Sequence, residues 1–264
     1  MYEFHKDKQA YFKQQVDNAA SYVIPFVSQR MAIGPGVDVL EVGCAEAGVL
    51  KAFIDAGCNG VGVELSESRA ALAKQFLDAY IRQGRARIIS KNIYDESFKA
   101  EFAGRFDLIV LKDVIEHIPD QQRIVSALKE FLKPGGTIFF GFPPWQMPFG
   151  GHQQVAKNKL LSKLPYYHLL PMPVYRWLLK RGGESEATVQ DLTEVKETGI
   201  SIERFERVVR NAGLQVLAKK HYLVNPIYKY KFGLNPREQI GAIQSLPVLR
   251  NFFTTCVYYL VGTK

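Results

Sequence analysis

Short apolar runs alternate with helix-like segments over the first half of this chain, and this alternation limits what the chain can fold into. The apolar runs stand at residues 37–42, 61–65, 87–89, 106–111 and 137–142, and each is predicted as a buried strand. Strands that alternate with helices pair in parallel through right-handed crossovers. The pattern therefore predicts an α/β fold with a three-layer sheet.

The segments on either side of these strands complete a single domain over residues 1–264. Residues 1–34 are predicted as an N-terminal helical cap that Pro25 kinks or ends, because apolar side chains recur every three or four residues: Phe12, Val16, Ala19, Val23 and Val27. Residues 35–142 form the core. Residues 143–199 mix prolines with aromatics, which predicts an insertion that packs back on the core. Residues 200–264 resume the α/β rhythm with a helix and two strands.

Composition excludes several classes of protein. No apolar run approaches the roughly 18 residues that span a bilayer, and the mixed charges of residues 1–15 argue against a signal peptide. The cysteines, Cys44, Cys58 and Cys256, are odd in number and form no Cys-x-x-Cys pair. That spacing argues against a disulfide framework and a structural zinc site. We therefore expect a cytoplasmic protein without a metal site.

The loop from Gly43 to Gly48, directly after the first strand, carries the sharpest chemical signal. Its small side chains let a ligand approach the backbone, and the helix that follows offers unpaired N–H groups. Glu64 ends the second strand, where a carboxylate accepts hydrogen bonds from both hydroxyls of a ribose. Each feature alone is weak, because such turns and strand ends are common. Together, in this order, they point to a ligand that contains adenosine.

Glu41 separates two adenosine ligands that share these features. A dinucleotide-binding fold normally keeps the first strand apolar, because a pyrophosphate lies beyond it. Glu41 instead places a carboxylate near the end of that strand. A carboxylate repels phosphate but attracts a cationic sulfonium and an ammonium group. The sequence therefore favours S-adenosylmethionine over a dinucleotide.

Four motifs between residues 35 and 142 resemble those of the class I S-adenosylmethionine-dependent methyltransferases. In chain order they are Val39-Leu40-Glu41-Val42-Gly43-Cys44, the ribose-binding acid Glu64, the fourth-strand motif from Phe106 to Ile118, and Leu132-Lys133-Pro134-Gly135-Gly136-Thr137. The third motif carries a Glu116-His117 pair, as in a small-molecule group of these enzymes. The resemblance implies a Rossmann-like sheet of about seven strands and a methyltransferase that converts S-adenosylmethionine to S-adenosylhomocysteine.

The resemblance also implies where the cofactor binds. Asn92 and Ile93 flank the adenine, while Asp113 and the backbone of Lys112 lie near the methionine end. The implied cofactor-binding residues are Glu41, Gly43, Cys44, Ala45, Gly48, Glu64, Leu65, Asn92, Ile93, Lys112 and Asp113.

The chain departs from the family pattern at two places. Ala45 and Ala47 stand where the family usually has the second and third glycines of its loop. Alanine is tolerated there if φ stays negative, and it should tighten or slightly displace the loop. Asn92 stands where the family often has Asp, and its amide oxygen can accept the hydrogen bond of the adenine amino group without a charge.

Catalysis of methyl transfer needs few groups, because the sulfonium is already activated and the acceptor must mainly be placed in line with the methyl group. A general base assists a hydroxyl acceptor by roughly 10²–10⁴-fold. The candidates are His117, His152 and Asp113. His152 follows the fifth strand, on the side where acceptors approach in this fold. The alternatives are a structural histidine at 117 and an ordinary loop histidine at 152.

The net charge of +8 is concentrated in one segment of the insertion, residues 151–181. Residues 151–181 contain six Lys and Arg residues and no Asp or Glu, whereas the remaining chain is nearly neutral. Such a segment suits a lid over the acceptor pocket, a peripheral contact with lipid headgroups, or an extra helical layer with solvated lysines. The turn before it, Phe142 to Trp145, is predicted to be rigid with an aromatic wall.

Three functions remain open at this point. The first is methylation of a small or amphiphilic, anionic acceptor, more at oxygen than at carbon. The second is RNA methylation, which predicts an RNA affinity that falls steeply with salt. The third is a non-catalytic module that keeps the cofactor fold, which turnover on hydroxylated acceptors would exclude. A positive charge concentrated in residues 151–181 favours the first, so nucleic acid is not the expected partner.

Overall fold

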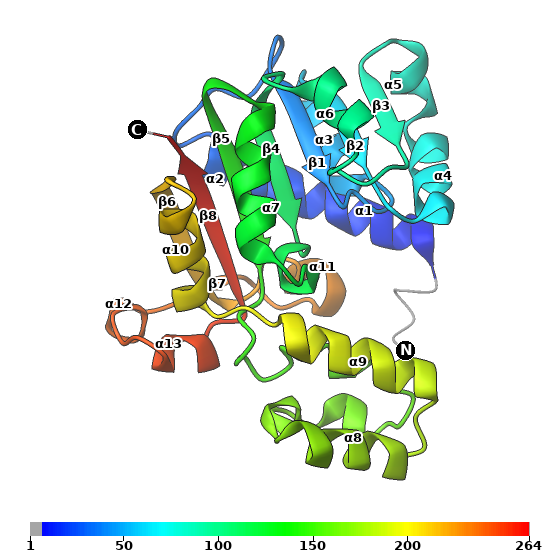
Figure 1. The fold of residues 1–264 in the computed structure, drawn as a ribbon, viewed down its shortest axis with the longest axis vertical. Helices are drawn as coiled ribbons and strands as arrows, with labels where there is room; N and C mark the ends of the chain where they lie inside the picture. The colour runs from blue at the N-terminus through cyan, green and yellow to red at the C-terminus, as the bar shows by residue number, and fades with distance from the viewer. Residues whose placement is uncertain (1–6, 264) are drawn as a thin grey trace.

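A sheet of eight strands forms the centre of the computed structural model, which describes residues 7–263, so residues 1–6 of the predicted cap lie outside the described residues. The strand order is β3-β2-β1-β4-β5-β8-β6-β7 (Figure 1). The strands are β1 (Asp38–Val42), β2 (Asn59–Val63), β3 (Ala86–Ile89), β4 (Phe106–Lys112), β5 (Leu132–Phe142), β6 (Gln215–Val224), β7 (Arg237–Glu238) and β8 (Cys256–Gly262). The five strands of the N-terminal half pair in parallel, as predicted, and β8 pairs antiparallel with both β5 and β6. The additional strand, β7, has two residues, too few for an alternating pattern.

Helices cover both faces of the sheet, which gives the three layers predicted (Figure 1). Side chains of β4 alternate between two apolar cores: Leu108 and Val110 face one, and Ile109 and Leu111 face the other. The first core is closed by α1 (Lys8–Asn18), α2 (Ile24–Val27), α3 (Gly48–Asp55) and α4 (Glu67–Phe76), and the second by α6 (Glu96–Phe102), α7 (Gln121–Leu128) and α10 (Ile202–Asn211). A short helix, α5 (Asp78–Arg82), follows α4.

Two helices begin where the sequence places a cap. The side chain of Ser66 accepts a hydrogen bond from the Arg69 N–H at the start of α4, and Asp120 accepts one from the Arg123 N–H at the start of α7. Each cap satisfies one of the backbone donors that a helix start leaves unpaired. Both caps fix where the loops after β2 and β4 end.

The N-terminal helix loses its regularity at Pro25, as expected. A π-helical turn, η2 (Ala19–Val23), ends two residues before the proline, and α2 ends two residues after it. Proline has no N–H to continue the ladder of hydrogen bonds, which accounts for the break. Ala19, Val23 and Val27 of the predicted apolar stripe are fully buried against the sheet.

The insertion after β5 is more helical than the sequence suggested. It contains three 3₁₀ turns, η5 (Gln153–Val155), η6 (Leu161–Lys163) and η7 (Tyr167–Leu169), and two helices, α8 (Met172–Arg181) and α9 (Glu186–Thr198). These elements enclose a small apolar core of their own around Tyr175 and Leu192. The aromatic wall expected at Trp145 faces this insertion, because its ring packs edge-on against His168 at 4.6 Å.

The C-terminal part adds three short helices that the sequence did not indicate: α11 (Tyr228–Phe232), α12 (Gly241–Gln244) and α13 (Leu249–Phe252). Buried polar contacts hold α13 on α10. Arg250 donates hydrogen bonds to the carboxylates of Glu203 and Glu206, at 2.9 and 3.1 Å. None of the helices in residues 7–263 has the length and apolar character needed to cross a membrane.

Candidate active site

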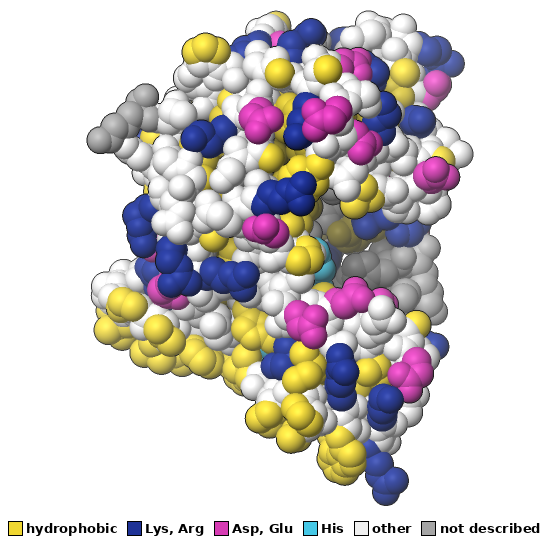
Figure 2. Space-filling view, viewed as in Figure 1, with side chains coloured by type: hydrophobic (Ala, Val, Ile, Leu, Met, Phe, Trp, Pro, Cys, Tyr) yellow, Lys and Arg dark blue, Asp and Glu magenta, His cyan; other side chains and the backbone are white. Residues whose placement is uncertain are grey.

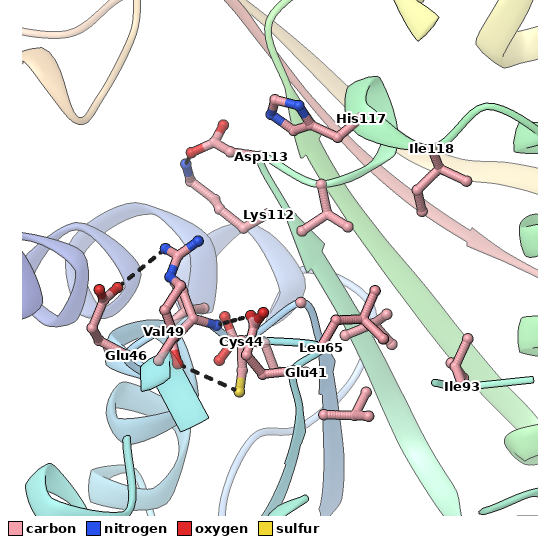
Figure 3. Close-up of a pocket in the computed structure, with 18 of the residues that line it drawn as sticks. Glu41, Cys44, Glu46, Val49, Leu65, Ile93, Lys112, Asp113, His117 and Ile118 are labelled. Carbon is pink, nitrogen blue, oxygen red and sulfur yellow. Dashed lines mark hydrogen bonds and ion pairs between the residues drawn. The ribbon is translucent and has the colours of Figure 1, made fainter. Parts of the chain in front are cut away.

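A cavity of about 550 Å³ opens at the carboxyl ends of β1, β2 and β4. In a parallel sheet, this edge is where ligands bind, because the strand order reverses there. Figure 3 shows two chemically different ends of the cavity. Leu65, Ile93 and Ile118 form an apolar end, whereas Lys112 and Asp113 form a charged end. The volume suits a ligand of cofactor size.

The loop between β1 and α3 lies along this cavity in an unusual conformation. Ala45 and Ala47 have φ values of 52° and 62°, in the left-handed region. The expectation that φ stays negative at these two alanines is therefore wrong. The Gly43 backbone, with φ of 67°, passes so near Val114 that a Cβ would lie 2.8 Å from its side chain. The loop keeps the backbone path that glycines would allow, at the expense of strain at the two alanines.

Replacing Ala45 with glycine is expected to stabilise the protein. A left-handed alanine costs about 1–2 kcal/mol, and glycine removes this cost while adding back roughly half of it as unfolded-state entropy. We expect Ala45→Gly to raise the free energy of unfolding by about 0.5 kcal/mol in urea denaturation. The control is Ala100→Gly at an exposed position of α6, which should lose about 1 kcal/mol. If both variants lost the same free energy of unfolding, Ala45 would not be strained in the native structure.

Glu64 holds the loop in place from the end of β2. Its two carboxylate oxygens accept hydrogen bonds from the N–H groups of Ala45, at 2.8 Å, and Ser66, at 2.9 Å. The side chain is largely buried and still lines the cavity. Each carboxylate oxygen has a second lone pair, so Glu64 can accept further hydrogen bonds from a ligand.

Glu41 is buried at the base of the cavity. One of its oxygens accepts a hydrogen bond from the N–H of Leu50, in the first turn of α3, at 2.8 Å. Burial raises the pKa of Glu41 to about 8, because removing the charged form from water outweighs that hydrogen bond and the attraction of Lys112. A cationic group beside Glu41 would restore the charged form, which is the complementarity expected for a sulfonium or an ammonium.

Lys112 and Asp113 form an ion pair at the charged end. The Lys112 Nζ lies 2.6 Å from a carboxylate oxygen of Asp113. Burial alone would raise the pKa of Asp113, but Lys112 outweighs it and holds the pKa below its usual value. Asp113 is therefore a weak proton acceptor. Its φ of 57° turns the chain back, so that the two neighbouring side chains meet.

The remaining candidate bases lie together on the other side of Asp113. His117 lines the cavity, and its ring centroid lies 4.8 Å from that of His152. Burial, with His117 as the next cause, lowers the pKa of His152 to about 4. Glu116 follows the end of β4 and is buried. The structure thus brings all three candidates, His117, His152 and Asp113, to one region.

The other predicted residues, including Cys44 and Gly48, also line the cavity. Leu65, Asn92 and Ile93 line the cavity, but the Asn92 amide oxygen already accepts a hydrogen bond from the Tyr94 N–H. Gly48 packs against α1, where a Cβ would lie 2.8 Å from the Phe12 carbonyl oxygen. Cys44 is buried, with its sulfur against Gly62.

Sequence reasoning missed the side chains that cover the loop. Tyr11, Phe12 and Gln15 of α1 line the cavity from above. Glu46, in the loop, holds α1 in this position, because its buried carboxylate pairs with Lys8 of α1 at 2.7 Å. The same carboxylate pairs with Arg69 of α4 at 3.2 Å. The apolar stripe predicted the helix, but nothing in its pattern says that its other face would close a cavity.

Comparison with known proteins decides the family. The family model described as a methyltransferase domain matches residues 12–183, which include the loop, Glu64 and the candidate bases. The chain belongs to the class I S-adenosylmethionine-dependent methyltransferases. Within the matched range, Glu41, Glu64 and the loop residues Gly43 and Gly48 line one cavity.

Relatives of this methyltransferase include ubiquinone biosynthesis O-methyltransferases. That of Leptothrix cholodnii is 31% identical over 114 residues, which are 43% of this chain and 47% of the relative. That of Thiobacillus denitrificans is 30% identical over 194 residues, covering 74% of this chain and 71% of the relative. The chain spans about half the length of the first of these relatives and of several others that it matches.

Solved structures of methyltransferases share the fold. Geranyl diphosphate C-methyltransferase from Streptomyces coelicolor, in complex with Mg²⁺, geranyl diphosphate and S-adenosyl-L-homocysteine, superimposes with a TM-score of 0.58. The two chains are 16% identical, and the match covers 92% of this chain and 79% of that one. A putative sarcosine dimethylglycine methyltransferase from Galdieria sulphuraria gives 0.56 at 12% identity, covering 93% and 84%.

Proposed function

We propose that this protein transfers the methyl group of S-adenosylmethionine to an oxygen atom of a small or lipid-like acceptor. The observation that carries the proposal is the pair of buried carboxylates, Glu41 and Glu64, on the two sides of one loop in a single cavity. One carboxylate suits a cationic group and the other suits a ribose. The names of the ubiquinone biosynthesis relatives support oxygen as the acceptor atom.

The cavity residues fit this cofactor in three regions. Glu64 would accept hydrogen bonds from the ribose hydroxyls, and Leu65 and Ile93 would enclose the adenine with Asn92 at its edge. Glu41 would attract the ammonium group, near the ion pair of Lys112 and Asp113. S-adenosylmethionine supplies an activated methyl group on a sulfonium. The backbone of the loop residues Gly43, Cys44, Ala45 and Gly48, which line the cavity, would run along the cofactor.

The protein's own contribution to the transfer is placement. In the proposed step, the acceptor oxygen forms a bond to the methyl carbon, the carbon–sulfur bond breaks, and its electron pair stays on sulfur. The acceptor proton passes to a base or to water. His117 is the best-placed base, since it lines the cavity and carries no ion pair among the described residues, whereas Asp113 is held by Lys112. Tyr11 and Phe12 exclude water from above.

Turnover on hydroxylated acceptors tests the proposal. We expect incubation with S-adenosylmethionine and a panel of phenols, catechols and prenylated phenols to yield S-adenosylhomocysteine and a methyl ether, detected by mass. The product should carry its methyl on oxygen. A protein that binds S-adenosylhomocysteine tightly but turns over no member of the panel would support the non-catalytic alternative instead.

The acceptor is further proposed to be met at an anionic lipid surface. Residues 151–181 of the insertion carry six exposed cations and no acidic side chain, and one of the six, Lys180, pairs with Glu186 of α9. Apolar side chains are exposed among them: Leu160, Leu164, Tyr166, Leu170, Val174 and Trp177. Figure 2 shows apolar side chains along the lower edge of the molecule, over α8 and over α12 and α13. Cations interleaved with exposed apolar groups suit a bilayer with anionic headgroups better than RNA.

Vesicle sedimentation tests this surface. We expect binding to phosphatidylglycerol vesicles that weakens at high salt. Replacing Lys159 and Lys163 with Glu should reduce binding at least about tenfold, since each cation near the surface contributes about 1 kcal/mol. Lys74→Glu with Arg82→Glu, two exposed cations away from the insertion, makes the same change in net charge and should have a small effect. If both double variants lost vesicle binding to the same extent, the insertion would not be the membrane-binding surface.

A further inference from the structure

Glu116, His117 and His152 bring three metal-binding side chains together beside the cavity. One ligand atom from each, a carboxylate oxygen and two imidazole nitrogens, lies within 4.8 Å of the other two. Two separate segments supply them. Glu116 and His117 belong to the 3₁₀ turn η3 (Ile115–His117) after β4, and His152 precedes η5 after β5.

The Glu116 carboxylate has no partner that explains its burial. It is 3% exposed, and within residues 7–263 neither of its oxygens has a hydrogen-bond partner. A buried carboxylate without a partner is costly, and such a group in a folded protein calls for an explanation such as a bound ion. A cation shared with the two imidazoles would supply the missing interactions.

The surrounding contacts hold both segments in position. The Thr198 hydroxyl, at the end of α9, donates a hydrogen bond of 2.6 Å to the Glu116 carbonyl oxygen. His152 has a φ of 54°, a left-handed conformation that is uncommon outside glycine. Gly151 before it packs so tightly on His168 that a Cβ would lie 2.4 Å from the His168 side chain. Rigid support of this kind is typical of residues that must present a side chain at a fixed place.

We propose that Glu116, His117 and His152 bind one divalent transition-metal cation of the zinc type. Two imidazoles and one carboxylate form a donor set that binds zinc and similar cations, with further positions left open. The ligand atoms must approach to about 3.4 Å from one another around a tetrahedral ion, which needs only small side-chain rotations. The spacing of the cysteines led us to expect no metal site, and this proposal differs because its ligands are a carboxylate and two histidines.

The cation would lie where the proposed acceptor approaches. His117 lines the cavity, so an open coordination position would face it. A divalent cation there would attract an acceptor hydroxyl and favour loss of its proton. With the cation bound, His117 is a ligand and no longer a free base, so the acceptor proton would pass to water instead. This consequence rests on the proposed function, whereas the binding of the cation does not.

Titration of the metal-stripped protein with Zn²⁺ tests the site without cofactor or acceptor. By calorimetry we expect one Zn²⁺ per chain at micromolar affinity or tighter, and weaker binding of Mg²⁺, which prefers oxygen ligands. Co²⁺ in place of Zn²⁺ should give the visible d–d absorption of a low-coordinate site in the unaltered protein. Absence of saturable Zn²⁺ binding up to millimolar concentration would overturn the proposal.

Matched variants assign the binding to these residues. Glu116→Gln and His152→Asn should each weaken Zn²⁺ binding at least about 100-fold and abolish the Co²⁺ absorption. Glu130→Gln, an exposed carboxylate elsewhere, should bind Zn²⁺ as the unaltered protein does. Far-UV circular dichroism checks that each variant is folded. Unchanged affinity in folded Glu116→Gln would place the cation elsewhere and overturn the proposal.

Discussion

Glu64→Ala is expected to weaken the binding of S-adenosylhomocysteine by about 100-fold, measured by calorimetry. The substitution removes two hydrogen bonds from ribose hydroxyls to a carboxylate, each worth about 1.5 kcal/mol or more. It also releases the N–H groups of Ala45 and Ser66, which Glu64 holds at 2.8 and 2.9 Å. The loop would then lose part of the conformation that lines the cavity.

Two further variants separate these effects. Glu64→Gln keeps the side-chain shape and one acceptor oxygen, so an intermediate loss of about tenfold is expected. Glu67→Ala removes an exposed carboxylate from the first turn of α4, outside the cavity lining, and should change the affinity by less than about twofold. Equal affinities for Glu64→Ala and Glu67→Ala would contradict the role of Glu64.

Arg250→Ala is expected to lower the free energy of unfolding by about 3 kcal/mol. Arg250 is nearly buried between two carboxylates, Glu203 and Glu206. The substitution leaves Glu203 without its cation and leaves Glu206 with Lys219 alone. Glu203 also accepts hydrogen bonds from the Val248 N–H and the Asn251 side chain, so the variant loosens the link between α10 and α13. For a chain of this size the melting temperature should fall by roughly 6–12 °C.

An exposed ion pair provides the control for Arg250. Arg82 pairs with Asp78 one helical turn away, and both side chains are more than half exposed. Such pairs contribute little, so Arg82→Ala should cost less than about 0.5 kcal/mol. The comparison is made by thermal unfolding under the same conditions. If Arg250→Ala were as stable as Arg82→Ala, the buried network would not hold α13 in place.

The sequence predicts the cofactor half of the fold well, because its signals there are local. Apolar runs of strand length, the caps Ser66 and Asp120, and the acids Glu41 and Glu64 each depend on neighbours in the chain. Parallel pairing then brings the carboxyl ends of β1 and β2 together without further information. For this reason the loop and both acids meet at one cavity, as expected.

The features that the sequence does not predict depend on contacts between distant segments. The closing of the cavity by α1 requires knowing which face of the helix meets the loop. Neighbouring strand residues normally point to opposite faces, so the ion pair of Lys112 with Asp113 arises only from the left-handed turn at Asp113. His152 reaches His117 only through the path of the insertion. The division into cap, core, insertion and C-terminal part stays a prediction.

The left-handed conformation of Ala45 and Ala47 is also imposed by contacts with distant segments, which the sequence does not predict. Because alanine disfavours positive φ, we expected Ala45 and Ala47 to keep negative φ values. The surrounding structure instead imposes a positive φ on both residues. Glu64 holds the Ala45 N–H, and α1 packs directly on Gly48, so the loop path is fixed from two sides. A local preference of about 1–2 kcal/mol is small beside these contacts.

Calorimetric titration of the unaltered protein with S-adenosylhomocysteine tests the central claim most directly. We expect one binding site per chain, with the affinity lost when Glu41 and Glu64 are both replaced by alanine. No heat of binding at millimolar ligand, or binding that survives the double substitution in a folded protein, would contradict it.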